Sequence, residues 1–143
     1  MDKFKCLNCG FVFPEEALGT KNRNHCPKCL WSVHLDLNVP GDRKSKCKGK
    51  MEPIFLSFKD EGGKKQGELS LVHRCLDCGA ISKNRIAGDD DTFEVVKVFK
   101  DSLNKDFAIA GVIEPLAHGS TDEIITQLFG RPNLEEYKKK FGL

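Results

Sequence analysis

Short apolar runs dominate the first part of the chain, and apolar residues at helical spacing dominate the last part. The runs at 51–58 (MEPIFLSF) and 67–75 (GELSLVHRC) are joined by a polar, glycine-containing segment, which predicts a β-hairpin. Further short strands are expected at 11–13 and 80–86. In LWSVHLDL at 30–37, apolar Trp31, Val33 and Leu35 alternate with polar residues, the pattern of a half-buried strand.

The pattern changes to helix at Asp89, Asp90 and Asp91, because carboxylates satisfy the free N–H groups of a helix start. A second helix is expected to begin at Ser120 or Thr121 and to end before Gly130, and a short third one to begin at Asn133. We therefore expect a small α+β protein, with antiparallel strands followed by two or three C-terminal helices.

Cysteine content changes this picture, because seven cysteines in 143 residues are an odd number and far above the usual share. We expect no export signal at the N-terminus and no stretch near the roughly 18 apolar residues of a membrane span. A cytoplasmic location without membrane contact is therefore expected, where cysteines stay reduced and act as metal ligands. Residues 1–88 carry 16 Lys and Arg against 10 Asp and Glu, whereas residues 89–143 carry 7 against 11. This split favours an anionic partner for the first part.

Two Cys-x-x-Cys pairs, Cys6 with Cys9 and Cys26 with Cys29, supply a complete four-sulfur set. Their separation is that of a zinc ribbon, in which tetrahedral zinc lies about 2.3 Å from each sulfur. Four thiolates leave the ion without an open position. We therefore expect a structural zinc ion here.

The remaining cysteines, Cys47, Cys75 and Cys78, predict a second zinc site, because the hairpin returns Cys75 to Cys47. His34 is the favoured fourth ligand, with His73 as the alternative. Water as the fourth ligand would instead make this zinc catalytic. The expected cofactors are two zinc ions.

Several further pieces occur in a characteristic order around Arg23-Asn24-His25-Cys26-Pro27, including Pro40-Gly41-Asp42-Arg43 and His73-Arg74-Cys75. In this pattern the chain resembles the RNHCP domain family over about residues 1–90. The resemblance implies a zinc-binding bacterial domain. We accordingly expect a zinc-ribbon-like double-site domain at 1–90 and a helical extension at 91–143 that packs on it.

The leading functional hypothesis is a non-catalytic module that binds RNA or the ribosome through basic loops beside the zinc turns. Arginine binds phosphate through two N–H groups and asparagine contacts bases or sugars. The candidate residues are Arg23, Asn24, Arg43, Arg74, Asn84 and Arg85. Arg23→Ala is expected to spare the fold and to weaken partner binding.

Two alternatives remain from the sequence. One is a metal-dependent, nuclease-like hydrolase that uses His25, His34 and Asp36, with magnesium held by the run at 89–91. The other is an adaptor whose C-terminal helices dock a protein partner. The oligomeric state is left open by the sequence.

Overall fold

The computed structural model describes residues 3–17, 23–36, 44–60, 66–105 and 113–143. Its N-terminal part contains a small antiparallel hairpin of β1 (Lys3–Lys5) and β2 (Val12–Pro14). Phe4 lies opposite Phe13, with ring centroids 5.8 Å apart. The first Cys-x-x-Cys turn joins these two strands, so the hairpin places the first metal ligands.

The second sheet has four antiparallel strands in the order β3-β4-β5-β6. The bounds are β3 Ser32–Val33, β4 Lys50–Asp60, β5 Gln66–Cys75 and β6 Ile81–Arg85. The predicted long hairpin is β4–β5, in which Met51 lies opposite Cys75. Its register shifts between Pro53 and Phe55, as expected where proline cannot donate to the ladder. This hairpin brings the end of β5 back to the segment that carries Cys47.

Three helices follow: α1 (Thr92–Ser102), α2 (Thr121–Phe129) and α3 (Leu134–Phe141). Short 3-10 turns, His118–Ser120 and Arg131–Asn133, precede α2 and α3. The Asp91 carboxylate caps α1 by accepting from the backbone N–H groups of Phe93 and Glu94. Gly130 and Gly142 follow α2 and α3 with φ of 90° and 71°, conformations that glycine adopts without strain.

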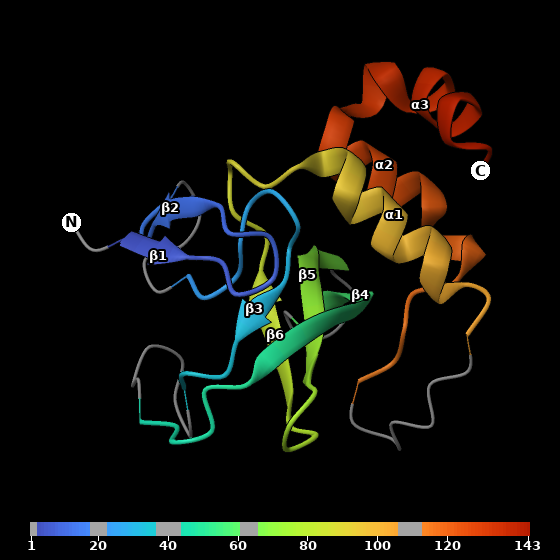
Figure 1. Ribbon diagram of the computed structural model, residues 1–143. Coiled ribbons are helices and arrows are strands. Elements are labelled where there is room, and N and C mark those ends of the chain that lie inside the picture. Colours follow the sequence, from blue (N-terminus) through green and yellow to red (C-terminus); the bar gives the residue numbers. More distant parts are fainter. Residues whose placement is uncertain (1–2, 18–22, 37–43, 61–65, 106–112) are drawn as a thin grey trace.

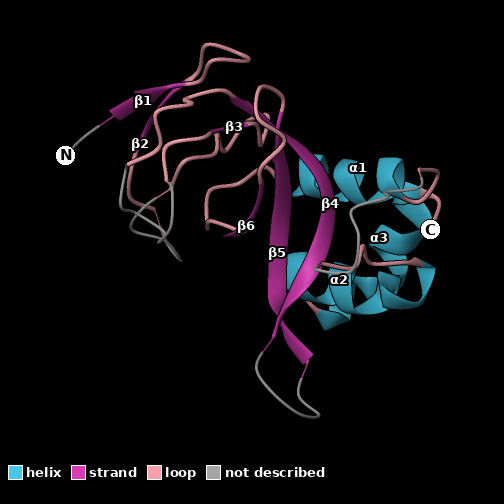
Figure 2. Ribbon diagram, turned by 90° about the horizontal axis from the view of Figure 1, so that it is seen from below, coloured by secondary structure: helices cyan, strands magenta, loops and turns pink. Residues whose placement is uncertain are grey.

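The helices lie on one side of the long β4–β5 ribbon, and the β1–β2 hairpin lies on the other side (Figures 1 and 2). The main core joins the sheet to the helices through buried apolar side chains: Leu30, Leu56, Leu69, Leu71, Val95, Phe99 and Ile124. Neighbouring Val72 instead belongs to a cluster with Ile54 and Phe55, because successive strand residues point to opposite faces. Together the antiparallel sheets, cysteine clusters and helices form a small α+β fold, as predicted.

One strand differs from its prediction. The alternating segment 30–37 contributes only Ser32 and Val33 to the sheet, and residue 37 lies outside the described residues. Beyond Val33 the chain pairs with a turn instead, since His34 N–H donates to Gly49 O and Lys48 N–H donates to His34 O. Leu30 and Ser32, rather than Trp31 and Val33, are the buried residues of this segment. This departure from the strand places His34 at the second cysteine cluster.

Candidate metal centres

The first cluster brings together the four sulfurs predicted from the sequence, Cys6, Cys9, Cys26 and Cys29. The Sγ atoms of Cys6 and Cys29 are 3.5 Å apart, and those of Cys9 and Cys26 are 3.7 Å apart. Tetrahedral zinc with bonds of about 2.3 Å requires sulfurs separated by roughly 3.8 Å. All four ligand atoms lie within 4.8 Å of one another. The cluster therefore fits a zinc ion bound by four thiolates.

The backbone of each Cys-x-x-Cys turn has the same form. In all three turns the residue after the second cysteine donates its N–H to the carbonyl of the first cysteine, over 2.8 to 3.0 Å. That residue has positive φ in every case: 80° at Gly10, 68° at Leu30 and 79° at Gly79. Lys48, which follows Cys47, also has positive φ, at 52°. Each of the three cysteine pairs, and the lone Cys47, is thus followed by a residue with a left-handed backbone conformation, which turns the chain around the sulfur atoms.

The second cluster consists of His34, Cys47, Cys75 and Cys78. Cys47 Sγ lies 3.6 Å from Cys75 Sγ, and Cys78 Sγ lies 3.3 Å from His34 Nδ1. Three thiolates and one imidazole form a common structural zinc set. The cluster fits a second four-coordinate zinc ion, with His34 in the fourth position as the sequence favoured.

His73, the alternative ligand, lies in the interior with both ring nitrogens engaged. Nε2 is 2.6 Å from Leu30 O, which only accepts, so this nitrogen carries the proton. Nδ1 then accepts from the Asn84 amide at 2.8 Å. Burial, reinforced by nearby His25, lowers the pKa of His73 to about 3. His73 is therefore a neutral core residue that links β5 to the second Cys-x-x-Cys turn.

The pKa values of the free thiols show which cysteines a zinc ion has to deprotonate when it binds. Burial raises the pKa of Cys29 to about 11 and raises that of Cys26 further. At Cys75, burial raises the pKa, but N–H groups of Cys78 and Asp77 donate to the sulfur and bring it down to about 7. Zinc binds thiolates, so loading both centres releases protons. At Cys26 and Cys29 the metal therefore has to displace protons that burial holds on the thiols.

The segment Arg23–Pro27 forms a clamp between the first centre and the loop that precedes α1. His25 Nε2 donates to the buried carboxylate of Asp90 at 2.7 Å, and the Arg23 guanidinium pairs with Asp89. Asp91 N–H donates to Pro27 O at 2.8 Å. We name these contacts the 23–27/89–91 clamp. Each of the three consecutive aspartates has a different structural partner, since Asp91 also caps α1.

Arg23, one of the predicted RNA contacts, is buried, whereas Asn24 and Asn84 are partly exposed and have hydrogen-bond partners within the protein. Arg23 is 1% exposed, donates to Pro14 O and lies 5.1 Å from the Phe13 ring centroid. Asn24 donates to Asp36, and Asn84 donates to His73 and Ser82. A buried arginine with these partners supports the fold, so Arg23→Ala is now expected to be destabilising.

The other predicted arginines lie at the surface or outside the described residues. The side chains of Arg74 and Arg85 are 43% and 56% exposed, and each faces a glutamate on a neighbouring strand, Glu52 at 4.0 Å and Glu68 at 3.5 Å. Arg43 falls outside the described residues. Arg74 and Arg85 are thus accessible cations whose charge is partly offset.

Sequence reasoning missed the exposed face of the first centre. Phe11, expected at the start of a short strand, is 43% exposed, with Lys28 Nζ 5.9 Å from its ring centroid. Leu7 and Val12 nearby are 57% and 54% exposed. Only the position of these residues in the sequence could have indicated their exposure, because residues inside and just after a Cys-x-x-Cys turn lie on the outside of a metal centre.

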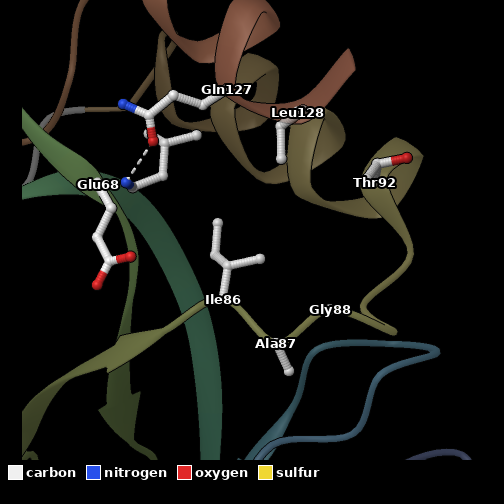
Figure 3. A pocket seen from close by; sticks show the side chains of 8 residues that line it. Glu68, Ile86, Ala87, Gly88, Thr92, Gln127 and Leu128 are labelled. Carbon is white, nitrogen blue, oxygen red and sulfur yellow. Dashed lines mark hydrogen bonds between the residues drawn. The ribbon is translucent and has the colours of Figure 1, made fainter. Parts of the chain in front are cut away.

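An open pocket of about 290 Å³ lies away from the cysteines, between the end of β6 and helices α1 and α2 (Figure 3). Two of its polar side chains, those of Gln127 and Glu68, contact other groups of the protein. Gln127 accepts from Leu69 N–H and donates to Gly67 O, while Glu68 faces Arg85. This pocket therefore presents no nucleophile paired with a base among its described lining residues.

Fold and donor sets together define a zinc-ribbon-like protein with two four-ligand zinc centres. The profile of the RNHCP domain matches residues 1–96, and the chain belongs to the RNHCP domain family. The match runs through the 23–27/89–91 clamp and into the first turns of α1. No curated protein and no solved structure matches the chain. Among the described helices, none has both the length and the apolar character needed to cross a membrane.

Proposed function

We propose that this zinc-binding module has no catalytic role and binds RNA, ribosomal RNA included, through cations that border the zinc centres. The main support for this proposal is the charge of three segments that carry metal ligands, 3–14, 23–33 and 44–50. These three segments contain seven lysines, all exposed, and neither aspartate nor glutamate, whereas the Cys75–Cys78 turn, which carries two further ligands, contributes one carboxylate, Asp77. The lysines are Lys3, Lys5, Lys28, Lys44, Lys46, Lys48 and Lys50. An excess of lysine over carboxylate in these segments favours a polyanion.

Zinc binding does not cancel this charge. A four-thiolate centre carries a net charge of −2 and a centre of three thiolates and one imidazole carries −1, since each ion brings two positive charges. The seven lysine charges exceed this total. Asp77 adds one further negative charge, which the lysines still exceed, and Arg74 and Arg85 add no net charge because each faces a glutamate. The surface around the centres therefore remains positive when both are loaded.

The donor sets support a binding role over hydrolysis. Each cluster offers four protein ligands, which completes the tetrahedral shell and leaves no position for an activated water. The residues considered for the hydrolase also have structural partners: His25 contacts Asp90, and Asp36 accepts from Asn24. The adaptor alternative would use the helical aromatic cluster, in which Phe129, Tyr137 and Phe141 are partly exposed and contact Phe93, which is 46% exposed.

Fluorescence anisotropy with labelled RNA at several salt concentrations tests the proposal. The triple variant Lys46→Ala/Lys48→Ala/Lys50→Ala removes three cations beside the second centre. A plot of log affinity against log salt has a negative slope, and each lost phosphate contact makes it less steep by about 0.7. For three lost contacts we expect the slope to become less steep by about 2. Affinity should fall at least tenfold at low salt.

A matched control removes the same charge from the helical part of the chain. Lys97, Lys105 and Lys139 are equally exposed, and their triple alanine variant should bind nearly as the wild type does. Equal losses in the two variants would indicate a response to net charge alone. Absence of salt-dependent RNA binding by the zinc-loaded wild type would refute the proposed function.

A further inference from the structure

An exposed apolar surface lies at the first zinc centre. Leu7, inside the Cys6–Cys9 turn, is 57% exposed, and Phe11 and Val12, just after it, are 43% and 54% exposed. We name these three residues the Phe11 face. The zinc-binding turn fixes their backbone, because Cys6 N–H donates to Phe11 O at 2.8 Å and Gly10 N–H donates to Cys6 O at 3.0 Å. Exposed apolar residues that lie close together in the sequence and are held by a rigid turn form a candidate interaction site.

Cations border this face. Lys28, at the tip of the second Cys-x-x-Cys turn, places Nζ 5.9 Å from the Phe11 ring centroid. Lys5 lies opposite Val12 in the β1–β2 register, so both side chains project from the same side of the hairpin. Neither 3–14 nor 23–33 contains a carboxylate. The Phe11 face thus combines an exposed aromatic ring with positive charge that no acidic neighbour in these segments offsets.

We infer that the Phe11 face binds an unpaired base, so that the RNA taken by this protein is single-stranded at the contact. This inference rests on the proposed function and specifies its ligand. A base inside a duplex is covered on both faces by its neighbours, whereas an unpaired base can stack on an exposed aromatic ring. Lys28 lies over the Phe11 ring, and Lys5 lies opposite Val12, so each lysine can meet a phosphate next to a base bound at this face. The exposed ring and the two neighbouring cations therefore suit one stacked base with its adjoining phosphates.

This mode of binding has two consequences. It tolerates different bases, because every base has a π face and the Phe11 face offers no fixed pair of hydrogen-bonding groups around the ring. It also requires little ordering of the protein, since the zinc turn already holds the backbone of Phe11. Aromatic character, rather than apolar volume, is then the property on which affinity depends.

The experiment measures anisotropy of the zinc-loaded full chain with a labelled oligouridylate of about 12 nucleotides and with an RNA duplex of equal length. The wild type should prefer the single strand. Phe11→Leu keeps apolar volume but removes the ring, and it should weaken single-strand binding about tenfold. Phe11→Trp should restore or increase affinity. Phe93→Leu, which changes another exposed aromatic on α1, should have no effect.

The outcomes separate the inference from the proposed function. RNA binding that ignores strandedness, or that is unchanged in Phe11→Leu, would overturn the Phe11 assignment and leave RNA binding intact. Displacement of oligouridylate by polyglutamate as readily as by unlabelled RNA would assign the face to acidic polypeptides and overturn the inference. Failure to bind either RNA would overturn the proposed function itself.

Discussion

The contacts of the 23–27/89–91 clamp predict that adjacent aspartates contribute very differently to the stability of the fold. Asp90 is 6% exposed, and its Oδ2 accepts from His25 Nε2 at 2.7 Å and from Ala87 N–H at 2.8 Å. Asp90→Ala removes both bonds and leaves two buried donors without a partner. A hydrogen bond to a buried charged group contributes about 1.5–3 kcal/mol, so the variant should lose roughly 3–5 kcal/mol of unfolding free energy.

Asp91→Ala provides the internal comparison. This residue is exposed and caps α1, so its loss should cost about 1 kcal/mol. Guanidinium-induced unfolding of the zinc-loaded proteins measures both variants, with fluorescence of Trp31, the single tryptophan, as the probe. Metal content measured in parallel shows whether both variants remain loaded.

The reasoning also predicts coupling between the two clamp residues. Because His25→Ala and Asp90→Ala remove the same bond, the double variant should cost at least 1 kcal/mol less than the sum of the single ones. If Asp90→Ala costs no more than Asp91→Ala, or if the two clamp substitutions add, Asp90 does not hold a buried contact. The three aspartates would then be no more than an exposed acidic helix start.

Two smaller predictions concern protonation and backbone strain. The pKa of His73 is about 3 in the fold against 6.5 when unfolded, so its contribution to stability is complete above pH 6.5 and is lost as pH falls toward 3. Between pH 7 and 5 the wild type should lose about 2 kcal/mol more than His73→Gln in denaturant titrations, and parallel pH profiles would exclude a buried neutral imidazole. Lys48 has positive φ and an exposed side chain, so Lys48→Gly should stabilise by about 1 kcal/mol, whereas Gly79→Ala should destabilise by a similar amount. Melting temperatures that shift in the same direction for both would contradict the strain argument.

The metal ligands were predictable because their chemistry is local. A Cys-x-x-Cys turn fixes two sulfurs by sequence spacing, and the β4–β5 hairpin brings Cys75 back to Cys47 through a register that apolar alternation encodes. The helix starts were predictable for the same reason. Asp91 does cap α1, although Ser120 and Asn133 make no side-chain capping bond at α2 and α3.

Burial of charged residues could not be predicted in this way. Arg23 looks like a surface cation in the sequence, but Asp89, 66 residues away, completes its buried environment. The choice between His34 and His73 likewise depended on tertiary structure. His73 shares its strand with Cys75, yet Leu30 O and Asn84 occupy both of its nitrogens. Charge and spacing are sequence properties, whereas the partner of a buried polar group is set by the whole fold.

The central claim is that the protein holds two zinc ions in the two clusters. X-ray absorption at the zinc edge, on protein with its metal content measured, tests this most directly. We predict two ions per chain and, averaged over both, between three and four sulfurs at about 2.3 Å with a minor nitrogen contribution at about 2.0 Å, because the clusters contain seven cysteines and His34. His34→Ala should remove the nitrogen signal and leave the sulfur signal. A single ion per chain, or a shell with substantially fewer sulfurs and bound water oxygen, would contradict the account.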